Sequence, residues 1–526
     1  MLTTTARSDE LFGHPKGLYV CFLTEMWERF AFYGMKALLF LYLIQHHKFD
    51  DASGYLLLGT YAGLAYALPL IGGMLADRYL GMRRAVVMGG VFLALGQLGM
   101  AYVGTPASSD GVRDQFAVQV MYFSLALIAV GVGYLKPNIS TIVGRLYGDS
   151  DPRRESGFTI FYMGINIGAM FASLICTAIS RKYGFGYGFG TAGVLMLVGL
   201  GNFILGQKYF NGVAEASHPE RLNQIIFGMP RQVWIYIGTL VSVVIVWQLL
   251  QTKISFAALS NLLGGHEVTA TEVVAVVMGL TLFGWLIWFT TKECSRVEAQ
   301  RMWVLFTLTA VSALFWGLYE QTYGAWVAVA DRATNLTDLD TAFYTWDAGA
   351  TTFFGGFFVV IMSPIFAALW PRLDRHGINP STPMKFAIAL LLCGLAFGAL
   401  AYGCHHPAEN GKMAAIWIVV AYAILIMGEM ALSPVGLSMV TSLSVARVVG
   451  LMMGAWFLFS AFGEIIAGRL STLAAIPQSE SATIGAPAAL NIYGAFFTQM
   501  MWVGVAAGVI LALFVPLLKR GMHGVK

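Results

Sequence analysis

Charged residues are scarce in this chain of 526 residues. Asp, Glu, Lys and Arg together make up 11% of it, whereas hydrophobic residues make up 57%. A soluble domain has about 25% charged residues, so the composition excludes a soluble multidomain protein and indicates a polytopic membrane protein. The formal net charge of +4 is small and dispersed along the sequence, which argues against a nucleic-acid-binding surface.

Cysteine is rare as well. The five cysteines lie far apart and mostly in apolar stretches, at Cys21, Cys176, Cys294, Cys393 and Cys404. Their odd number argues against a disulfide framework, and their spacing matches no metal site. We interpret them as small, buried apolar residues.

Signals for an enzyme or for a cleaved leader are missing too. His266 and Glu267 begin a pair like that of zinc proteases, but no second histidine follows four residues later, and there is no G-x-S-x-G elbow. We therefore do not expect an enzyme, and in particular not an intramembrane peptidase. No cleavable signal peptide is evident, because the first ten residues are mostly polar and residues 14–16 lead directly into a full-length apolar run.

Fourteen apolar runs are long enough to cross a membrane. The first six lie near residues 17–45, 54–77, 84–104, 115–146, 156–180 and 187–207, and the last six near 300–329, 346–370, 384–404, 413–441, 449–474 and 492–518. Two further runs, Val233 to Leu250 and Val273 to Phe289, lie between the groups. We predict an all-α polytopic membrane protein with two six-helix bundles (17–210 and 299–520), a connector with two additional helices (211–298), and terminal segments 1–16 and 521–526.

Basic residues predict the orientation, because loops rich in Lys and Arg stay in the cytoplasm. They gather after the even-numbered runs, while the opposite loops carry few. We therefore expect both termini to be cytoplasmic and the chain to lie in the cell (inner) membrane. The residues concerned are Arg78, Arg83, Arg84, Arg145, Arg153, Arg154, Arg372, Arg375, Lys385, Arg447, Lys519 and Arg520.

Two carboxylates and a guanidinium interrupt the first apolar run. Glu25, Glu28 and Arg29 lie roughly 15 Å deep, near the bilayer centre. An ionised side chain at that depth costs at least about 2.5–3.5 kcal/mol, so these groups must face protein or a water-filled path. They share one helical face of about 140° with Tyr33 and Lys36, and the i,i+4 spacing allows Glu25 and Arg29 to pair. The pattern is typical of proteins that move charged solutes.

The loop between the second and third runs resembles the signature of the major facilitator superfamily. Residues 73–84 match the pattern G-x-x-x-D-R-x-x-G-x-R-R. Six plus six helices with both ends inside is also the layout of this superfamily, whose halves hold substrate between them. The resemblance implies a major facilitator fold, here with 14 membrane helices.

Four further segments resemble motifs of the proton-dependent oligopeptide transporter family, a branch of the major facilitators. The family patterns are E-x-x-E-R-F-x-Y-Y-G, G-x-G-x-x-K-P-N, F-Y-x-x-I-N-x-G and G-E-x-x-x-S-P-x-G-L. The corresponding segments are Glu25 to Gly34, Gly131 to Asn138, Phe161 to Gly168 and Gly428 to Leu437. The resemblance extends from the first to the last span, and an extra helix pair in the connector is typical of bacterial members.

The resemblance implies a symporter that imports di- and tripeptides by alternating access, with protons as coupling ion, no cofactor, and a monomer in the lipid bilayer as the functional form. Arg29 and Lys136 would hold the peptide carboxylate, and Glu429 and Asn166 its amino group. Glu25 and Glu28 would compete with the bound carboxylate for Arg29. A glutamate that loses this partner would gain a proton.

Other residues complete the implied site. Glu320 paired with Lys36 would form a second proton switch, which opens the outer gate and adds charge to the substrate site. Tyr33, Tyr66 and Trp456 would shape the cavity wall, although ordinary packing explains each of these aromatic residues equally well.

The chain departs from the family at three places. Phe32 replaces the first tyrosine of the Y-Y-G element, and Lys36 stands where relatives often have arginine, which keeps the charge but loses bidentate contact. Aligned on the Ser-Pro pair at 363–364, the family's Asn-Pro pair falls at Gly355 and Gly356. A hydrogen-bonding group near the peptide's amino end is then missing, which bears on selectivity rather than on the transport class.

Two other functions fit the same residues. The scaffold would also suit nitrate, an amino-acid conjugate or another small anion or zwitterion, as in some plant members of the family. A nutrient sensor that binds but does not transport would keep the same site. Uptake of a labelled dipeptide at two external pH values separates these functions from peptide symport.

Overall fold

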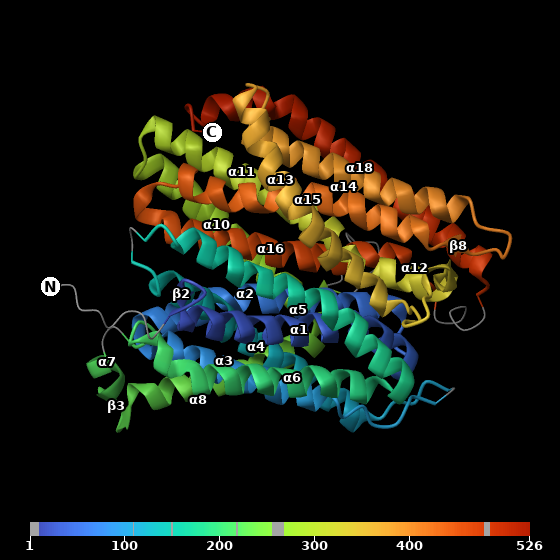
Figure 1. The fold of residues 1–526 in the computed structure, drawn as a ribbon, viewed down its shortest axis with the longest axis horizontal. Coiled ribbons are helices and arrows are strands. Elements are labelled where there is room, and N and C mark those ends of the chain that lie inside the picture. Colours follow the sequence, from blue (N-terminus) through green and yellow to red (C-terminus); the bar gives the residue numbers. More distant parts are fainter. Residues whose placement is uncertain are drawn as a thin grey trace. The chain divides into compact units, whose positions relative to one another are not determined.

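The structure, a computed structural model, describes residues 10–108, 110–148, 151–216, 219–254, 268–477 and 484–525, and helices dominate it (Figure 1). In these ranges, 12 helices are long and apolar enough to cross a membrane. Two more long helices are less apolar, because α1 (Lys16–Leu41) carries five charged side chains and α3 (Met82–Met100) has two arginines near its start. Together they account for the fourteen predicted spans. The His266–Glu267 pair lies outside the described residues.

The first half of the chain supplies six of the long helices, and the connector two more. After α1 come the π-helical turn η2 (Tyr42–His46), α2 (Asp51–Leu75), the π-helical turn η3 (Ala76–Leu80), α3, α4 (Gln115–Arg145), α5 (Arg154–Tyr183), α6 (Phe185–Gly206) and the 3-10 turn η4 (Gln207–Phe210). The connector holds the short α7 (Pro219–Asn223), α8 (Arg231–Gln251) and α10 (Ala270–Lys292).

The second half contains the remaining six spans. They are α11 (Arg296–Tyr319) with η5 (Glu320–Tyr323) and α12 (Ala325–Ala333), α13 (Phe353–Arg375), α14 (Thr382–His405), α15 (Ile416–Leu443), α16 (Val449–Ser471) and α18 (Ala486–Gly521). Four two-residue strand pairs tie loops together: β1 (Glu10–Leu11) with β2 (His14–Pro15), β3 (Ile225–Ile226) with β4 (Met229–Pro230), β5 (Lys253–Ile254) with β6 (Val268–Thr269), and, in parallel, β7 (Thr334–Asn335) with β8 (Met413–Ala414).

The described residues group into two compact units. Unit 1 comprises Met1–Tyr42, His46–Lys48 and Leu64–Gln251, and unit 2 comprises Leu43–Gln45, Phe49–Gly63 and Thr252–Lys526. In unit 1, α1 packs against α5 and α6, and α3 packs against α4 and α6. In unit 2, α14 packs against both α15 and α18, and α11 packs against α16 (Figure 1).

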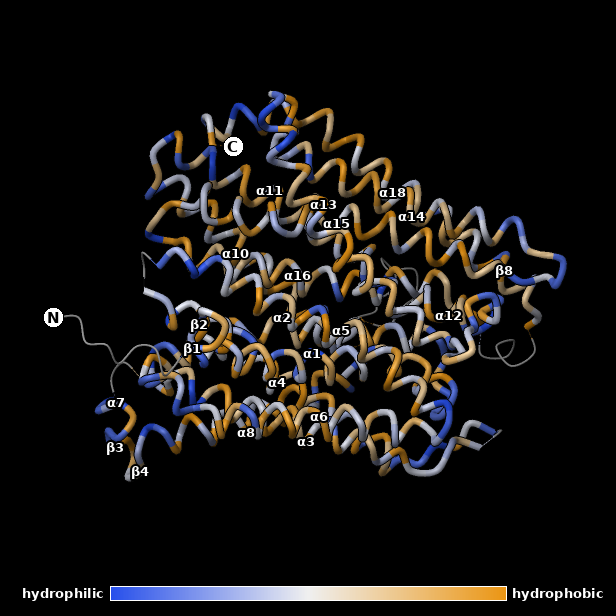
Figure 2. Tube along the Cα trace, in the orientation of Figure 1, coloured by the Kyte–Doolittle hydropathy of each residue, from blue (hydrophilic) through white to orange (hydrophobic). Residues whose placement is uncertain are grey.

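Hydropathy follows the helices. Hydrophobic residues dominate the middle of the long helices, while hydrophilic residues gather at their ends and in the connecting segments (Figure 2). Several helix starts are fixed by side chains. Asp114 accepts a hydrogen bond from the Ala117 N–H at 3.1 Å, which lowers the pKa of this carboxylate, and Thr269 with Glu272 forms a capping box at the start of α10.

The two connector helices belong to different units. In unit 1, α8 is bonded to α4 through the hydroxyls of Tyr134 and Thr239, which lie 2.8 Å apart. In unit 2, α10 is held to α16 by an ion pair of 2.6 Å between Glu272 and Arg469. At the other end of α10, the guanidinium of Arg447 donates to the Glu293 carbonyl.

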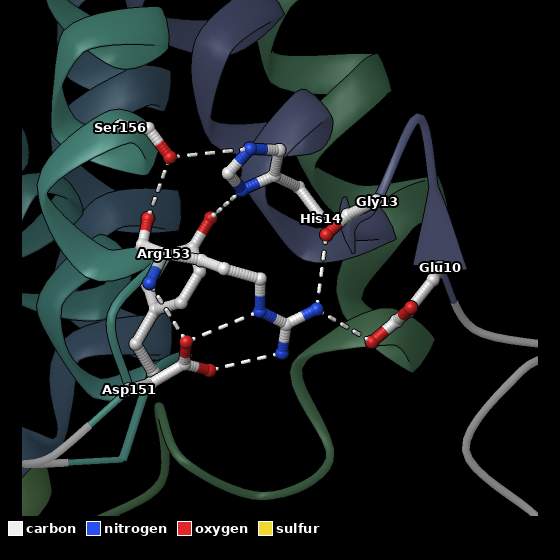
Figure 3. A network of polar contacts seen from close by, with 7 residues as sticks. Glu10, Gly13, His14, Asp151, Arg153 and Ser156 are labelled. Atoms are coloured by element: carbon white, nitrogen blue, oxygen red, sulfur yellow. Dashed lines mark hydrogen bonds and ion pairs between the residues drawn. The ribbon is translucent and has the colours of Figure 1, made fainter.

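Arg153 fixes the start of the described chain to the connection between α4 and α5 (Figure 3). Its guanidinium pairs with Asp151 at 2.9 Å and donates to Glu10 and to the Gly13 carbonyl, both at 2.9 Å. The hydrogen bonds from the Arg153 side chain and backbone N–H to Asp151 lower the pKa of the Asp151 carboxylate. Beside them, His14 bonds the Tyr147 hydroxyl at 2.8 Å. The β1–β2 hairpin is therefore anchored to the loop that precedes α5.

Candidate functional site

Arg29 and two carboxylates form a buried cluster in the middle of α1. Arg29 Nη2 donates to Oε1 of Glu28 at 2.5 Å, and Nε donates to the second oxygen of the same carboxylate. The predicted i,i+4 pair is also present, since Arg29 Nε lies 3.4 Å from Oε1 of Glu25. All three residues are at most 2% exposed. One guanidinium therefore serves two carboxylates away from bulk water.

The two carboxylates are not equivalent. Both oxygens of Glu28 are bonded to Arg29. In contrast, Oε2 of Glu25 is buried and has no hydrogen-bond partner among the described residues. A buried carboxylate oxygen without a hydrogen-bond donor is costly when it is charged. Of the two glutamates, we therefore expect Glu25 to accept a proton.

Two aromatic rings of α1 flank the guanidinium. The Arg29 guanidinium carbon lies 5.1 Å from the ring centroid of Phe32 and 5.8 Å from that of Tyr33. Tyr33 is half-buried, while Lys36, one helical turn further on, is fully buried. The replacement of a tyrosine by Phe32 therefore keeps the aromatic face against Arg29 and removes only a hydroxyl.

Lys136 of α4 is the second candidate cation of unit 1. Its ammonium lies 4.2 Å from the ring centroid of Tyr66 on α2, and it attracts the Glu25 carboxylate electrostatically. Pro137 follows it inside α4, where the missing N–H breaks one backbone hydrogen bond. Lys136 and Tyr66 are both half-buried. Arg29 and Lys136, the two cations that we expect to bind a carboxylate, thus both act electrostatically on Glu25.

Asn166 of α5 is placed by close packing between α5 and α1. Gly168, two residues later, lies against the Met26 carbonyl so closely that a Cβ atom would not fit. The Asn166 amide donates to the Tyr162 carbonyl of its own helix at 2.9 Å, and the residue is half-buried. The glycine of the F-Y-x-x-I-N-x-G pattern is therefore needed for α5 to approach α1.

In unit 2, Glu320 lies at a break in the seventh span. The predicted span near 300–329 is present, but it is interrupted: α11 ends at Tyr319, and η5 and α12 follow. Gln321 stabilises the break, because its amide donates to the Ala467 carbonyl of α16 at 2.9 Å and its carbonyl accepts from the Ser471 hydroxyl at 2.6 Å. Glu320 is 9% exposed.

Glu429 of α15 is buried beside Tyr319. The Tyr319 hydroxyl is hydrogen-bonded to the Glu429 carboxylate, and Glu320 repels this carboxylate electrostatically. Oε2 of Glu429 is buried without a hydrogen-bond partner in the described part of the chain. Tyr319 was not among the predicted site residues. It stands directly before Glu320 in the sequence, but only the fold shows that it contacts Glu429.

Trp456 of α16 is packed inside unit 2. It is 4% exposed, its ring lies against Gly436 of α15, and it contacts Phe386 edge-to-face with 6.4 Å between centroids. In this structure the bulk of the ring serves packing between α15, α16 and α14.

Gly355 and Gly356, to which we expect the family's Asn-Pro pair to align, lie near the start of α13. A Cβ atom at Gly355 would meet its nearest neighbour, the ring of Tyr422, at 3.7 Å, an ordinary contact distance. The Tyr422 hydroxyl donates to the Thr322 carbonyl at 3.4 Å. A Cβ atom would therefore fit at Gly355 beside the Tyr422 ring.

A second buried ion pair lies in unit 2 and was not predicted. Arg332 binds both oxygens of Asp51, at 2.5 and 2.7 Å, and donates to the Tyr493 hydroxyl at 2.9 Å. The Ile476 N–H also donates to Asp51, at 3.0 Å. Asp51 begins α2, and Arg332 is near the end of α12. No pattern in the sequence relates two residues so far apart.

Each unit thus presents buried carboxylates at mid-span, with a cation or a phenol against them. Such groups bind charged solutes and exchange protons, and long apolar helices that carry them define a secondary transporter. A family model described as the POT family matches residues 83–488, and the chain belongs to this family.

Relatives and solved structures agree. The chain is 34% identical to an uncharacterized transporter of Bacillus subtilis, covering 98% of this chain and 96% of the relative. It is 32% identical to dipeptide and tripeptide permease A of Cronobacter turicensis, covering 98% and 95%. The crystal structure of a peptide transporter, POT, in complex with sulfate superposes with a TM-score of 0.79 at 31% identity, covering 98% and 97%. The predicted major facilitator fold is therefore confirmed.

Proposed function

We propose that the protein is a proton-coupled symporter that imports di- and tripeptides by alternating access across the cell (inner) membrane, with both termini in the cytoplasm. Membership of the POT family and the names of the relatives support peptides as cargo. The position of basic residues after the even-numbered spans supports the orientation.

The observation that carries the proposal is the sharing of Arg29 between Glu25 and Glu28. A peptide carboxylate that binds Arg29 becomes a third competitor for the same guanidinium. The glutamate that is displaced then keeps a buried charge without a counter-ion, and protonation removes this cost. Peptide binding and proton uptake are thereby coupled.

The remaining candidate residues fit a zwitterionic cargo. Lys136 adds a second cation for the peptide carboxylate, while Asn166 and Glu429 serve the amino group. Tyr33 and Tyr66 line the site in unit 1, and Lys36 joins them at the end of this cationic face. Glu320, next to the break in the seventh span, provides a second proton site. Trp456 contributes by supporting α15, which carries Glu429.

Proton symport is also sufficient in energy. Each proton that moves inward gains about 2.3 kcal/mol per 100 mV of membrane potential. A tenfold concentration ratio costs about 1.4 kcal/mol. One proton that moves inward at 100 mV can therefore concentrate a neutral zwitterion roughly 40-fold.

The test is uptake of a labelled dipeptide into proteoliposomes at two external pH values, with unlabelled di-, tri- and tetrapeptides as competitors. We expect accumulation that rises with the inward proton gradient, competition by di- and tripeptides, and little competition by tetrapeptides. Uptake that ignores pH, or that peptides do not inhibit, would refute the proposal.

One comparison favours a second candidate cargo, a single amino acid. A POT family transporter that is 25% identical to this chain, with a TM-score of 0.77, has been solved in complex with 5-aminolevulinic acid. Gly355 and Gly356 also offer no side-chain amide where we expect the family's Asn-Pro pair. Including amino acids and nitrate in the competition panel decides between the cargoes. Binding without accumulation would indicate a sensor.

A further inference from the structure

A narrow groove runs along unit 1 between α2, α4 and the connector helix α8. It has a volume of about 400 Å³. Each of the three helices lines one part of the groove: α2 one side, α4 the bottom and α8 the other side. The lining residues are Leu68, Ile71, Gly72 and Leu75 of α2, Val130, Gly133 and Tyr134 of α4, and Trp234, Ile235, Gly238, Thr239 and Ser242 of α8. The groove is mostly apolar, and none of the site residues described above lines it.

The shape of the groove follows from how the three helices pack. Gly72 of α2 lies directly against the Gly133 carbonyl of α4, so these two helices touch and close the bottom. On the other side, α8 is fixed to α4 by the Tyr134–Thr239 hydrogen bond and by Gln119, which donates to Gln251 at 2.8 Å. Gly238 of α8 leaves its wall open, because a Cβ atom there would meet no atom within 4 Å.

One end of the groove is polar and basic. Arg231, the first residue of α8, lies over the ring of Tyr79 at 5.2 Å and donates to Gln224 at 2.6 Å. Arg84 donates to Gln232 at 3.2 Å. Trp234, which lines the groove, donates its indole N–H to the Ile226 carbonyl at 2.7 Å. Two guanidinium groups and an aromatic residue of interfacial type thus stand where the apolar walls end.

The surrounding segments carry an excess of positive charge. The basic residues Arg78, Arg83, Arg84, Arg221 and Arg231 outnumber the acidic residues Asp77, Glu215 and Glu220, and Glu215 is paired with Arg83 at 2.5 Å. By the orientation proposed above, this end faces the cytoplasm.

We propose that the groove binds one anionic phospholipid of the cytoplasmic leaflet. An acyl chain lies between α2 and α8, and the phosphate group binds at Arg231 and Arg84. The ligand must be an amphiphile with one negative head, because the walls are apolar and the cations are confined to one end. In a neutral phospholipid such as phosphatidylcholine, the positive choline offsets the attraction of the phosphate to the same guanidinium groups. The lipid fills the groove between α8 and the helices α2 and α4, which gives α8 a role independent of the cargo.

The proposal rests on membrane insertion and orientation but not on peptide transport, so the two fail separately. The experiment is native mass spectrometry of the purified, delipidated full chain, titrated with phosphatidylglycerol or with phosphatidylcholine. We expect one phosphatidylglycerol to bind first, at a concentration about fivefold or more below that needed for phosphatidylcholine.

Two kinds of variant locate the site. Gly238→Phe places a ring in the groove, and we expect it to abolish the tight phosphatidylglycerol adduct. Gly284→Phe is its matched control, because a Cβ atom at Gly284 of α10 also meets nothing within 4 Å and the residue is remote from the groove residues in sequence. Arg231→Gln and Arg84→Gln leave the groove open, and each should weaken phosphatidylglycerol about fivefold without affecting phosphatidylcholine.

The outcomes are decisive. Loss of the adduct in Gly238→Phe but not in Gly284→Phe, together with weakening by the arginine variants, supports the site. If the unmodified protein binds phosphatidylglycerol and phosphatidylcholine equally well, the proposed site is refuted. Unchanged binding in Gly238→Phe overturns the location, and binding that ignores both arginine variants overturns the assignment of an anionic head group. If Gly238→Phe does not fold, the arginine variants alone still decide.

Discussion

Arg29 is paired with two carboxylates in the middle of a mostly apolar helix. Such a cluster costs free energy to bury, and hydrophobic residues of similar size would often be as stable or more so. Its value is therefore functional. A third anion would compete with both partners of this guanidinium. Glu25 has a buried carboxylate oxygen without a hydrogen-bond partner among the described residues, so we expect it to take the proton.

At this scale we predict that Glu28→Gln abolishes concentrative uptake but spares counterflow exchange. The amide keeps the size of the side chain and a hydrogen bond to Arg29, but it has no charge, so Arg29 is no longer shared between two carboxylates. Gradient-driven uptake should fall to the passive level, while exchange of labelled for unlabelled dipeptide across proteoliposomes continues. Exchange serves as the control for folding. Retained concentrative uptake would remove Glu28 from the coupling role.

Lys136→Ala should weaken peptides that have a free C-terminus. A charge-assisted hydrogen bond is worth about 1.5–3 kcal/mol, so we expect KM to rise roughly 10- to 100-fold. The same peptides with an amidated C-terminus should be affected little. Lys208→Ala is the matched control, since Lys208 also lies over a tyrosine ring, that of Tyr209 at 5.1 Å, but at the end of a span. Equal losses for free and amidated peptides would contradict a carboxylate clamp at Lys136.

Among the elements, α15 and α16 depend on one contact between a glycine and a ring. Trp456 lies so close to Gly436 that a Cβ atom cannot fit without moving the indole. The glycine of the G-E-x-x-x-S-P-x-G-L pattern is thereby explained as a packing requirement, which holds the helix carrying Glu429 in place.

We therefore predict that Gly436→Ala destabilises the protein by about 1–3 kcal/mol, the usual cost of overpacking a core. Thermal unfolding in detergent measures the loss. Gly450→Ala on α16 is the matched control, because a Cβ atom at Gly450 meets nothing within 4 Å. Equal unfolding temperatures for the two variants would show that Trp456 moves aside freely.

The ion pair between Asp51 and Arg332 connects the start of α2 with the end of α12 within unit 2. Removing one partner leaves an uncompensated buried charge, so Arg332→Met should destabilise the protein by about 3–5 kcal/mol. Arg83→Gln, in an ion pair with Glu215 whose side chains are 31% and 49% exposed, should cost at most about 1 kcal/mol. Denaturant or thermal unfolding of both variants tests the difference, and equal losses would mean that burial adds nothing to the Asp51 pair.

On the scale of the whole molecule, the sequence predicts the spans well but not their breaks and partners. The spans follow from apolar runs of membrane length, and the pairing of Glu25 with Arg29 follows from helical spacing. The break at Glu320 does not, because Gln321 donates to the Ala467 carbonyl and accepts from the Ser471 hydroxyl, and both partners lie about 150 residues further along. Local pattern carries no information about such contacts.

The connector shows the same limit. Its two helices were predicted as an additional pair, yet each is bonded to a different unit, α8 through Thr239 and α10 through Glu272. The i,i+3 pattern of Thr269 and Glu272 predicts a helix start. It does not reveal that Glu272 also binds Arg469.

In the proposed coupling, the peptide carboxylate displaces a glutamate from Arg29, and the displaced glutamate takes up a proton. Proton uptake on peptide binding measures this exchange. A neutral dipeptide is added to the protein in weakly buffered detergent solution near pH 7 with a pH indicator. We predict that the protein takes up protons from the solution when the dipeptide binds, that an amidated dipeptide causes no such uptake, and that the Glu25→Gln/Glu28→Gln double variant shows none. Dipeptide binding without proton uptake, or uptake that persists in the double variant, would contradict the account.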